Sequence, residues 1–305
     1  MMESMKKYMQ VGIVHFMAYP TTIRGEGPIL ETVRKIAVDD YFDAIEITWV
    51  KDKAIRQKVT EMLKTAGMTL AYAAQPRLLT TGLNVNALDE KVRLEAIASL
   101  KEGIDEAYEM GAVGFAFLSG KYEEDKKEAA FEALVKSTKE LCAYARSKGD
   151  LKIVLEIFDY DVDKKSLIGP VDLAKRFAEV IRAEYDNFGL MVDLSHIPQI
   201  HETIEESILP IKDYIVHAHI GNCVLKDPAM AAYGDAHPRF GFENSENGVD
   251  EVVHFLKVLM DIGFLSEEKR PIVSFEVKPW GDEDSDLVVV NAKRVLNLAW
   301  AKLNN

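Results

Sequence analysis

The chain has 305 residues, of which 48% are hydrophobic and 29% charged, and its formal net charge is −13 at pH 7. This length can bury a substantial core, and the acidic balance argues against a nucleic-acid partner, whose phosphates are neutralised mainly by Lys and Arg. No apolar run has the length of a membrane span and the N-terminal MMESMKKYMQ has no signal-peptide pattern, so we expect a cytoplasmic protein without a membrane partner.

Short apolar runs alternate with amphipathic helical segments along the whole chain. The segments 88–111, 123–149 and 284–303 have helical spacing of their apolar residues, and Gly111 is placed as a C-cap. The predicted strands are 11–17, 42–50, 68–75, 112–119, 151–158, 188–195, 214–221 and 271–278.

Eight strands that are each followed by a helix, with no linker-like segment between them, predict an α/β fold. We expect a single (β/α)8 TIM barrel that forms one domain over residues 1–305. A doubly wound open sheet is the alternative, and it would need a Gly-rich phosphate turn. Neither GxGxxG nor GxxxxGK[ST] occurs in the sequence, which favours the closed barrel.

The strand YIVHAHIG carries two of the seven histidines of the chain. Because strand side chains alternate between faces, Ile215, His217 and His219 are expected on the inward face. The opposite face, expected to pack under the helices, carries Tyr214, Val216, Ala218 and Ile220. His219 is nearer the catalytic end of the strand, whereas His217, one layer deeper, is expected to form a hydrogen bond inside the barrel.

The last four predicted strands each carry a potential metal ligand toward the end where barrel active sites lie. Neighbouring strands are about 4.8 Å apart, so these side chains can converge, and three converging carboxylates would repel one another without a cation. Oxygen-rich ligation with one imidazole suits Mn²⁺, Mg²⁺ or Co²⁺ better than a structural zinc site, and Zn²⁺ stays open. The four residues are Glu156, Asp193, His219 and Glu276. Glu46, on strand 42–50, is interpreted instead as a salt-bridged or exposed residue.

The motifs LEIFD, VDLSH, HAHIGN and SFEVKP resemble those of the xylose isomerase-like TIM barrels. This superfamily holds sugar isomerases and epimerases such as the tagatose 3-epimerase group, inosose dehydratases and endonuclease IV. The resemblance covers essentially the whole chain and implies one catalytic divalent metal, preferably Mn²⁺, held by Glu156, Asp193, His219 and Glu276. The VDxxH spacing marks His196 as a substrate contact or as a support for a metal ligand.

The segment after the seventh predicted strand, YGDAHPRFGFENSENG, offers Asp235, His237 and Arg239 as candidates for substrate contact, with His237 and Arg239 expected to bind it. In members similar to endonuclease IV, a DxH motif here joins the VDxxH histidine on an extra metal, so a second metal at His196, Asp235 and His237 stays open. A surface loop stabilised by turn residues is the alternative. The third and fourth strands end in AAQPRLL and FAFLSGKY, without the histidines of the endonuclease pattern, which argues against DNA repair.

The resemblance to the epimerase branch implies a sugar or keto-sugar isomerase or epimerase of carbohydrate metabolism. Such enzymes abstract a proton next to a carbonyl and form a metal-bound enediolate, with Glu156 and Glu276 as the expected acid/base pair. Lys278 is placed to contact substrate or to form a salt bridge, and His15 and Trp49 to line the pocket. A metal-dependent dehydratase of the inosose or dehydroshikimate type, and a metal-free barrel that binds a ligand or partner, are the alternatives. A small carbohydrate is the expected partner, and a homo-oligomer is open.

Overall fold

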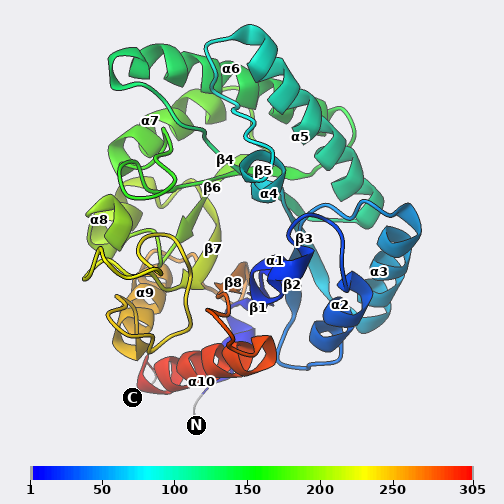
Figure 1. Ribbon diagram of the computed structural model, residues 1–305, viewed down its shortest axis with the longest axis vertical. Helices are drawn as coiled ribbons and strands as arrows, with labels where there is room; N and C mark the ends of the chain where they lie inside the picture. The colour runs from blue at the N-terminus through cyan, green and yellow to red at the C-terminus, as the bar shows by residue number, and fades with distance from the viewer. Residues whose placement is uncertain (1–2, 304–305) are drawn as a thin grey trace.

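The computed structural model describes residues 3–303 and contains one parallel sheet of eight strands surrounded by helices (Figure 1). The strands pair in the order β1-β8-β7-β6-β5-β4-β3-β2, and a parallel bridge between Val14 and Glu46 brings β1 back to β2. This closure confirms the predicted (β/α)8 barrel. The strands are β1 Gln10–Ile13, β2 Ala44–Ile47, β3 Thr69–Ala73, β4 Gly114–Leu118, β5 Lys152–Glu156, β6 Phe188–Asp193, β7 Ile215–Gly221 and β8 Ile272–Glu276.

Helices connect successive strands and surround the sheet. Those that follow β1 to β8 in turn are α2 Ile29–Ala37, α3 Lys53–Ala66, α5 Glu90–Met110, α6 Lys127–Arg146, α7 Val171–Arg182, α8 Ile204–Ile208, α9 Val249–Asp261 and α10 Ser285–Leu303. Two short helices, α1 His15–Ala18 and α4 Gln75–Leu79, lie directly after β1 and β3. The 3-10 turns are η1 Met5–Lys7, η2 Pro20–Thr22, η3 Glu124–Lys126, η4 Pro198–Ile200 and η5 Leu209–Ile211.

Capping residues explain where several helices begin and end. The Asp52 and Asp89 carboxylates accept backbone N–H bonds at the starts of α3 and α5. The predicted C-cap Gly111 ends α5 with a φ of 74°, in the left-handed region. The predicted helix 123–149 is shorter, because η3 precedes α6 and the helix ends at Arg146. The first predicted strand is also shorter, because α1 begins at His15.

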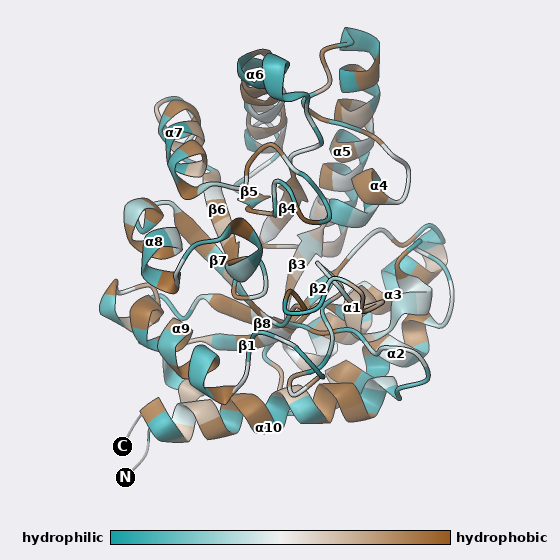
Figure 2. Ribbon diagram, turned by 60° about the vertical axis from the view of Figure 1, so that its left-hand side comes forward, coloured by the Kyte–Doolittle hydropathy of each residue, from teal (hydrophilic) through white to brown (hydrophobic). Residues whose placement is uncertain are grey.

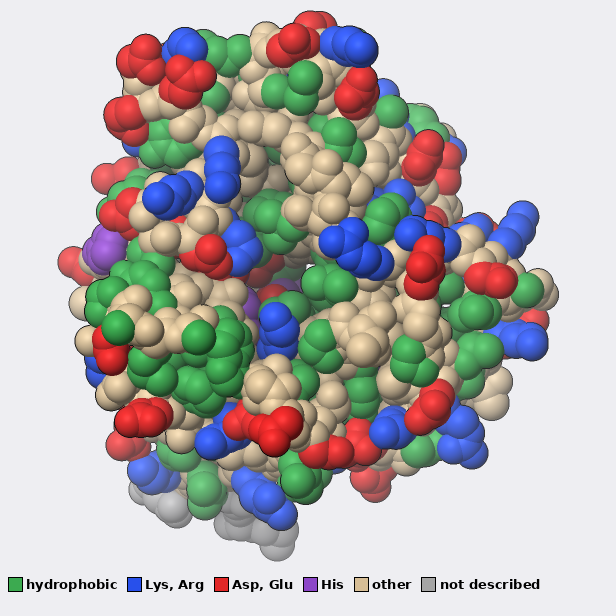
Figure 3. All heavy atoms as spheres, viewed as in Figure 1, with side chains coloured by type: hydrophobic (Ala, Val, Ile, Leu, Met, Phe, Trp, Pro, Cys, Tyr) green, Lys and Arg blue, Asp and Glu red, His purple; other side chains and the backbone are tan. Residues whose placement is uncertain are grey.

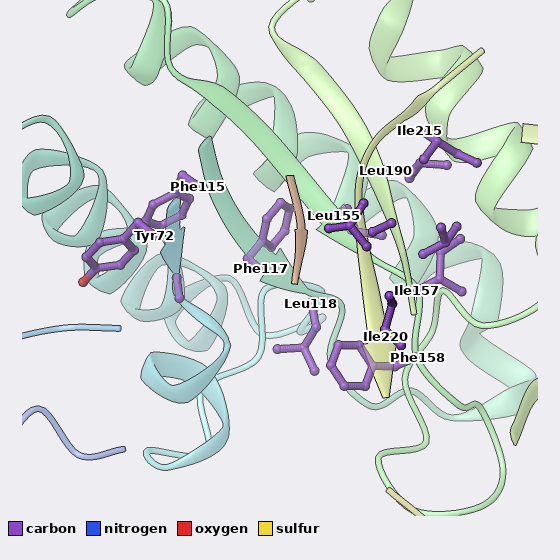
Figure 4. Close-up of a cluster of buried hydrophobic side chains, with 14 of the residues drawn as sticks. Tyr72, Phe115, Phe117, Leu118, Leu155, Ile157, Phe158, Leu190, Ile215 and Ile220 are labelled. Carbon is purple, nitrogen blue, oxygen red and sulfur yellow. The ribbon is translucent and has the colours of Figure 1, made fainter. Parts of the chain in front are cut away.

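The alternation predicted for β7 is wrong at its start. Leu190 of β6 pairs with Ile215, but the next residue of β6 pairs with His217, so Val216 is an extra residue in β7. Such a bulge shifts the face on which the preceding side chain lies. Ile215 therefore packs beside Leu190 in the main core (Figure 4), whereas Val216 packs against Met191 in a small separate cluster.

The main hydrophobic core lies between the strands and the helices. It includes Phe115, Phe117, Leu155 and Leu190, whose side chains are buried (Figure 4). The surrounding helices alternate hydrophilic and hydrophobic residues along their length, as expected of helices with one buried face (Figure 2). Across residues 3–303, no helix combines the length and apolarity that a membrane crossing requires.

Candidate active site

Four potential ligand residues converge at the carboxyl-terminal end of the barrel. Glu156, Asp193 and Glu276 end β5, β6 and β8, and His219 lies on β7 between them. His219 Nδ1 lies 2.6 Å from Glu276 Oε2, 3.4 Å from Glu156 Oε1 and 3.6 Å from Asp193 Oδ2. All four residues are buried, and one potential ligand atom of each lies within 4.8 Å of those of the other three. The structure thus brings together the four residues that the sequence proposes as metal ligands.

The four facing atoms have no hydrogen-bond partner of suitable geometry among residues 3–303. These atoms are Glu156 Oε1, Asp193 Oδ2, His219 Nδ1 and Glu276 Oε2. Buried polar atoms without a partner are uncommon in folded proteins, and here all four point to a common position. Burial opposes a charge on His219, but Glu46 and Glu276 raise its pKa well above the usual value. The cluster therefore favours a positive charge at its centre, and its donor set fits a divalent cation.

The remaining oxygens of two of these carboxylates are held in place by the protein. Glu156 Oε2 accepts a hydrogen bond of 2.6 Å from Gln75 Nε2, which begins α4. Asp193 Oδ1 accepts a bond of 2.6 Å from the backbone N–H of Ser195. Each carboxylate thus has one oxygen fixed and one facing the centre. Sequence analysis missed Gln75, although its place directly after β3 puts it at the same end of the barrel.

Glu46 lies beside both histidines of β7, so of the two interpretations given to it the ion-paired one holds and the exposed one is wrong. Its Oε1 lies 2.7 Å from His217 Nε2 and 3.0 Å from His219 Nε2, and Glu46 is only 1% exposed. Burial opposes ionisation of this carboxyl, but the two imidazoles hold its pKa well below the usual value. His217 forms the interior hydrogen bond expected from its depth.

A second buried group surrounds Asp235 in the loop after β7. Its Oδ1 lies 3.0 Å from His196 Nε2 and 2.8 Å from His237 Nε2, and its Oδ2 lies 2.9 Å from Lys164 Nζ. Burial opposes their charges, yet Asp235 and neighbouring carboxylates raise the pKa of His196 to about 10 and that of His237 to about 9. The residues predicted for a second metal thus come together, but the Lys164 ammonium already supplies a positive charge there.

His237 lies close to the glycine that ends β7. His237 has a φ of 49°, which non-glycine residues adopt uncommonly. A Cβ at Gly221 would lie 3.1 Å from His237 Nδ1 and 2.9 Å from the Glu276 carbonyl oxygen. The glycine at the end of β7 therefore allows His237 to approach the acidic cluster.

A cavity of about 170 Å³ opens onto the cluster. Glu156, His219 and Glu276 contribute to its lining together with Lys164 and Lys278. Its apolar walls come mainly from the segments after β1, β3 and β5, and include Val14, Phe16, Met17, Ile23, Leu79 and Phe158. The space-filling view shows a hollow in the centre of this face, with basic and acidic side chains around it (Figure 3). The site can therefore enclose a small molecule between an acidic cluster and apolar walls.

Four residues predicted to contact substrate lie outside the lining of this cavity, and their roles stay predictions; they are His15, Trp49, His196 and Arg239. Arg239 Nε pairs with Glu283 at 2.7 Å, and Trp49 Nε1 donates to the Ile23 carbonyl at 3.1 Å. His15 Nε2 lies 2.7 Å from the Thr32 hydroxyl, and burial lowers its pKa to about 3. Lys278 does line the cavity, and its backbone N–H donates to the His237 carbonyl at 2.7 Å.

Solved structures, among them two that are named as sugar epimerases, share this fold. The D-psicose 3-epimerase of Clostridium cellulolyticum H10, solved with D-tagatose, is 19% identical, with a TM-score of 0.66 and 97% of each chain covered. An IolI protein with a bound zinc atom is 19% identical, with a TM-score of 0.72, over 97% of this chain and 99% of that one. The 3-keto-D-glucoside 4-epimerase of E. coli is 12% identical, with a TM-score of 0.66, over 95% and 99%. With these TM-scores and such low sequence identities, the comparisons establish similarity of fold alone.

Comparison of the sequence itself gives a more specific result. A search of curated protein sequences finds no significant relative. The family model described as xylose isomerase-like TIM barrel matches residues 35–286, which is most of the chain and includes β2 to β8. This match agrees with the barrel topology and with the resemblance carried by the strand-end motifs. The chain therefore belongs to the xylose isomerase-like TIM barrel family.

Proposed function

We propose that this protein is a divalent-metal-dependent isomerase or epimerase of a sugar or keto-sugar. The observation that carries the proposal is the convergence of four buried ligand atoms without hydrogen-bond partners, among the described residues, at the end of a small cavity. The similar structures named for psicose, tagatose, ribulose and 3-keto-glucoside epimerases support the reaction class.

The ion would be held by Glu156, Asp193, His219 and Glu276. Three carboxylates and one imidazole favour Mn²⁺, with Mg²⁺, Co²⁺ and Zn²⁺ as the other candidates. When bound, a divalent ion acts as a Lewis acid toward a carbonyl oxygen and orients the substrate.

Glu156 and Glu276 are the proposed acid and base. One carboxylate removes the proton from the carbon next to the substrate carbonyl, and the other returns a proton to the opposite face or to the neighbouring carbon. Burial raises the pKa of the Glu276 carboxyl above its usual value. The Gln75 amide keeps one oxygen of Glu156 in place, and Phe16 and Phe158 contribute apolar walls to the cavity.

Hydrogen exchange into the substrate tests this function. The Mn²⁺-loaded protein is incubated in D₂O with ketoses, keto-sugars and keto-inositols, and the products are followed by NMR and mass spectrometry. We expect deuterium to appear in the substrate or product at a carbon next to a carbonyl. This should occur without loss of water and only when metal is present. Exchange with loss of water would assign a dehydratase instead. A protein that binds no divalent ion, or that binds one and catalyses no exchange, would contradict the proposal.

A further inference from the structure

One carboxylate oxygen bonded to two histidines lies directly below the proposed metal site. We propose that Glu46 is a positioning residue, which fixes the tautomer and ring orientation of His219 so that Nδ1 faces the cation. The inference rests on the proposed metal site but concerns a residue that is not one of its four ligands.

The hydrogen bonds to Glu46 determine which nitrogen of His219 carries a proton. Glu46 Oε1 lies 2.7 Å from His217 Nε2 and 3.0 Å from His219 Nε2. An ionised carboxylate can only accept hydrogen bonds, and a protonated carboxyl has a single hydrogen to donate. One oxygen shared by two imidazole nitrogens is therefore best satisfied when both nitrogens carry hydrogen. A neutral His219 then has its lone pair on Nδ1.

That lone pair is directed at the acidic cluster. His219 Nδ1 lies between 2.6 and 3.6 Å from oxygens of Glu276, Glu156 and Asp193. A lone pair facing three carboxylates is unfavourable unless a cation or a proton lies among them. Histidines that bind metals usually donate their other ring N–H to a carboxylate or carbonyl, which orients the ring and increases its basicity. Glu46 is in position to do this for His219.

The surroundings of Glu46 restrict its carboxylate to this role. Its backbone forms the bridge to Val14 that closes the barrel, and its side chain reaches across the interior to β7. Among residues 3–303, the two imidazoles are the only hydrogen-bond or ion-pair partners of the carboxylate. The rings of His217 and His219 are nearly perpendicular, at 86°, so their N–H groups approach the same oxygen from different directions. His217 thus holds the carboxylate in the orientation that His219 requires.

The substitution Glu46→Gln tests the inference through metal affinity, which does not depend on catalysis. The amide keeps the size of the side chain but loses its charge, and its NH₂ group can donate to His219 Nε2 and so favour the wrong tautomer. We expect Mn²⁺ to bind about 10- to 100-fold more weakly, as measured by calorimetry on metal-free protein. The matched control is Ser274→Ala on β8, where the buried hydroxyl has no partner among the described residues, and its affinity should equal that of the wild type.

NMR of protein with ¹⁵N-labelled histidine gives a second readout that a purely structural role would not change. In Zn²⁺-loaded wild-type protein, His219 should carry hydrogen on Nε2 and metal on Nδ1, and Glu46→Gln should disturb this pattern. Should that variant fail to fold, Glu46→Asp, which keeps the charge on a shorter side chain, should bind Mn²⁺ more weakly than the wild type.

Two results would separate this inference from the proposed function. Wild-type affinity and an unchanged His219 tautomer in Glu46→Gln would overturn the positioning role and leave the metal-dependent function intact. In the second result, the wild type binds Mn²⁺ but catalyses no exchange, and Glu46→Gln binds Mn²⁺ more weakly than the wild type. This would support the positioning role and contradict the proposed isomerase activity. A wild type that binds no divalent ion would overturn both.

Discussion

At the scale of single residues, the two proposed proton carriers differ in their surroundings. Glu156 has one oxygen bonded to Gln75 and the other 3.4 Å from His219 Nδ1, whereas Glu276 has one oxygen 2.6 Å from that nitrogen and the other 3.7 Å from His237 Nε2. Two carboxylates held differently on either side of one imidazole are suited to opposite halves of a proton transfer.

Replacing either carboxylate separately tests this division of roles. Glu156→Gln and Glu276→Gln should each lower the rate of deuterium exchange by about 10²- to 10⁴-fold, because an amide can neither take nor return the proton. The far-UV circular dichroism of both variants should match that of the wild type, and Ser274→Ala should retain exchange. Exchange at the wild-type rate in both glutamine variants would exclude this acid/base pair.

The four proposed ligands could be predicted from sequence because each lies near the end of a strand, where a period of two assigns it to the inward face. Glu46 satisfies the same pattern, but its role depends on two histidines more than 170 positions away along the chain. Lys164 lies in a loop, where no periodicity indicates the direction of a side chain. The local sequence pattern was thus enough to predict the four proposed ligands. The contacts of Glu46 across the barrel and of Lys164 from its loop could be found only in the structure.

At the scale of elements, the bulge in β7 explains both a wrong prediction and the presence of a glycine. Val216 is the extra residue of this strand, and a Cβ at Gly189 of β6 would lie 2.5 Å from both of its γ carbons. The pattern HAH shows the inward histidines, but no residue type in the strand marks the bulge before them. The irregular register of β7 could therefore not be predicted from alternation.

Steric coupling between these two strands can be measured. Gly189→Ala should destabilise the protein by about 1–3 kcal/mol, because the methyl group has no space beside Val216. Val216→Ala removes both γ carbons, so the double variant should recover part of this loss, with a coupling free energy of about 0.5–3 kcal/mol. Urea denaturation of the wild type, the two single variants and the double variant gives the four free energies of unfolding of this double-mutant cycle. Additive losses would show that the two residues do not compete for space.

The loop after β5 is organised by a single carboxylate. Asp159 is fully buried and accepts hydrogen bonds of 2.7 to 3.1 Å from four backbone N–H groups, those of Val162, Asp163, Lys164 and Lys165. This arrangement brings Lys164 to Asp235 and to the cavity.

Removing the Asp159 carboxylate should increase the mobility of the loop after β5 more than it lowers the stability of the barrel strands. Asp159→Ala should cost about 1–3 kcal/mol, because four backbone donors lose a charged acceptor. Amide hydrogen exchange should accelerate at residues 162–165 and change little in β5 and β6. Asp159→Asn, which keeps one acceptor oxygen, is the control and should have a smaller effect. Unchanged protection of these four amides would contradict the role of Asp159.

At the scale of the whole molecule, the proposed metal site joins four neighbouring strands. Glu156, Asp193, His219 and Glu276 belong to β5, β6, β7 and β8, so an ion held by all four would link half of the barrel. The alternation of eight strands with helices made this architecture predictable, because each βα unit is local in sequence.

Metal loading should therefore stabilise the fold measurably. At a free Mn²⁺ concentration of one hundred times its Kd, binding adds about 2.7 kcal/mol to the free energy of unfolding. The melting temperature should rise by about 2–4 °C for each kcal/mol, and a chelator should reverse the rise. Asp193→Asn is the control and should show a smaller rise at the same concentration. A wild-type melting temperature that does not respond to any divalent ion would contradict the metal site.

The closure of the barrel also determines where the polypeptide could be cut and rejoined. β1 pairs along four residues with β8, whereas the bridge of Val14 with Glu46 joins it to β2, and the Glu3 carbonyl accepts a hydrogen bond of 2.7 Å from Trp300 of α10. A circular permutation that joins the two ends and opens the chain near the exposed Asp40 would place β8, α10 and β1 in one continuous strand–helix–strand unit. The new termini would lie between α2 and β2, and the four proposed ligands would keep their order along the chain.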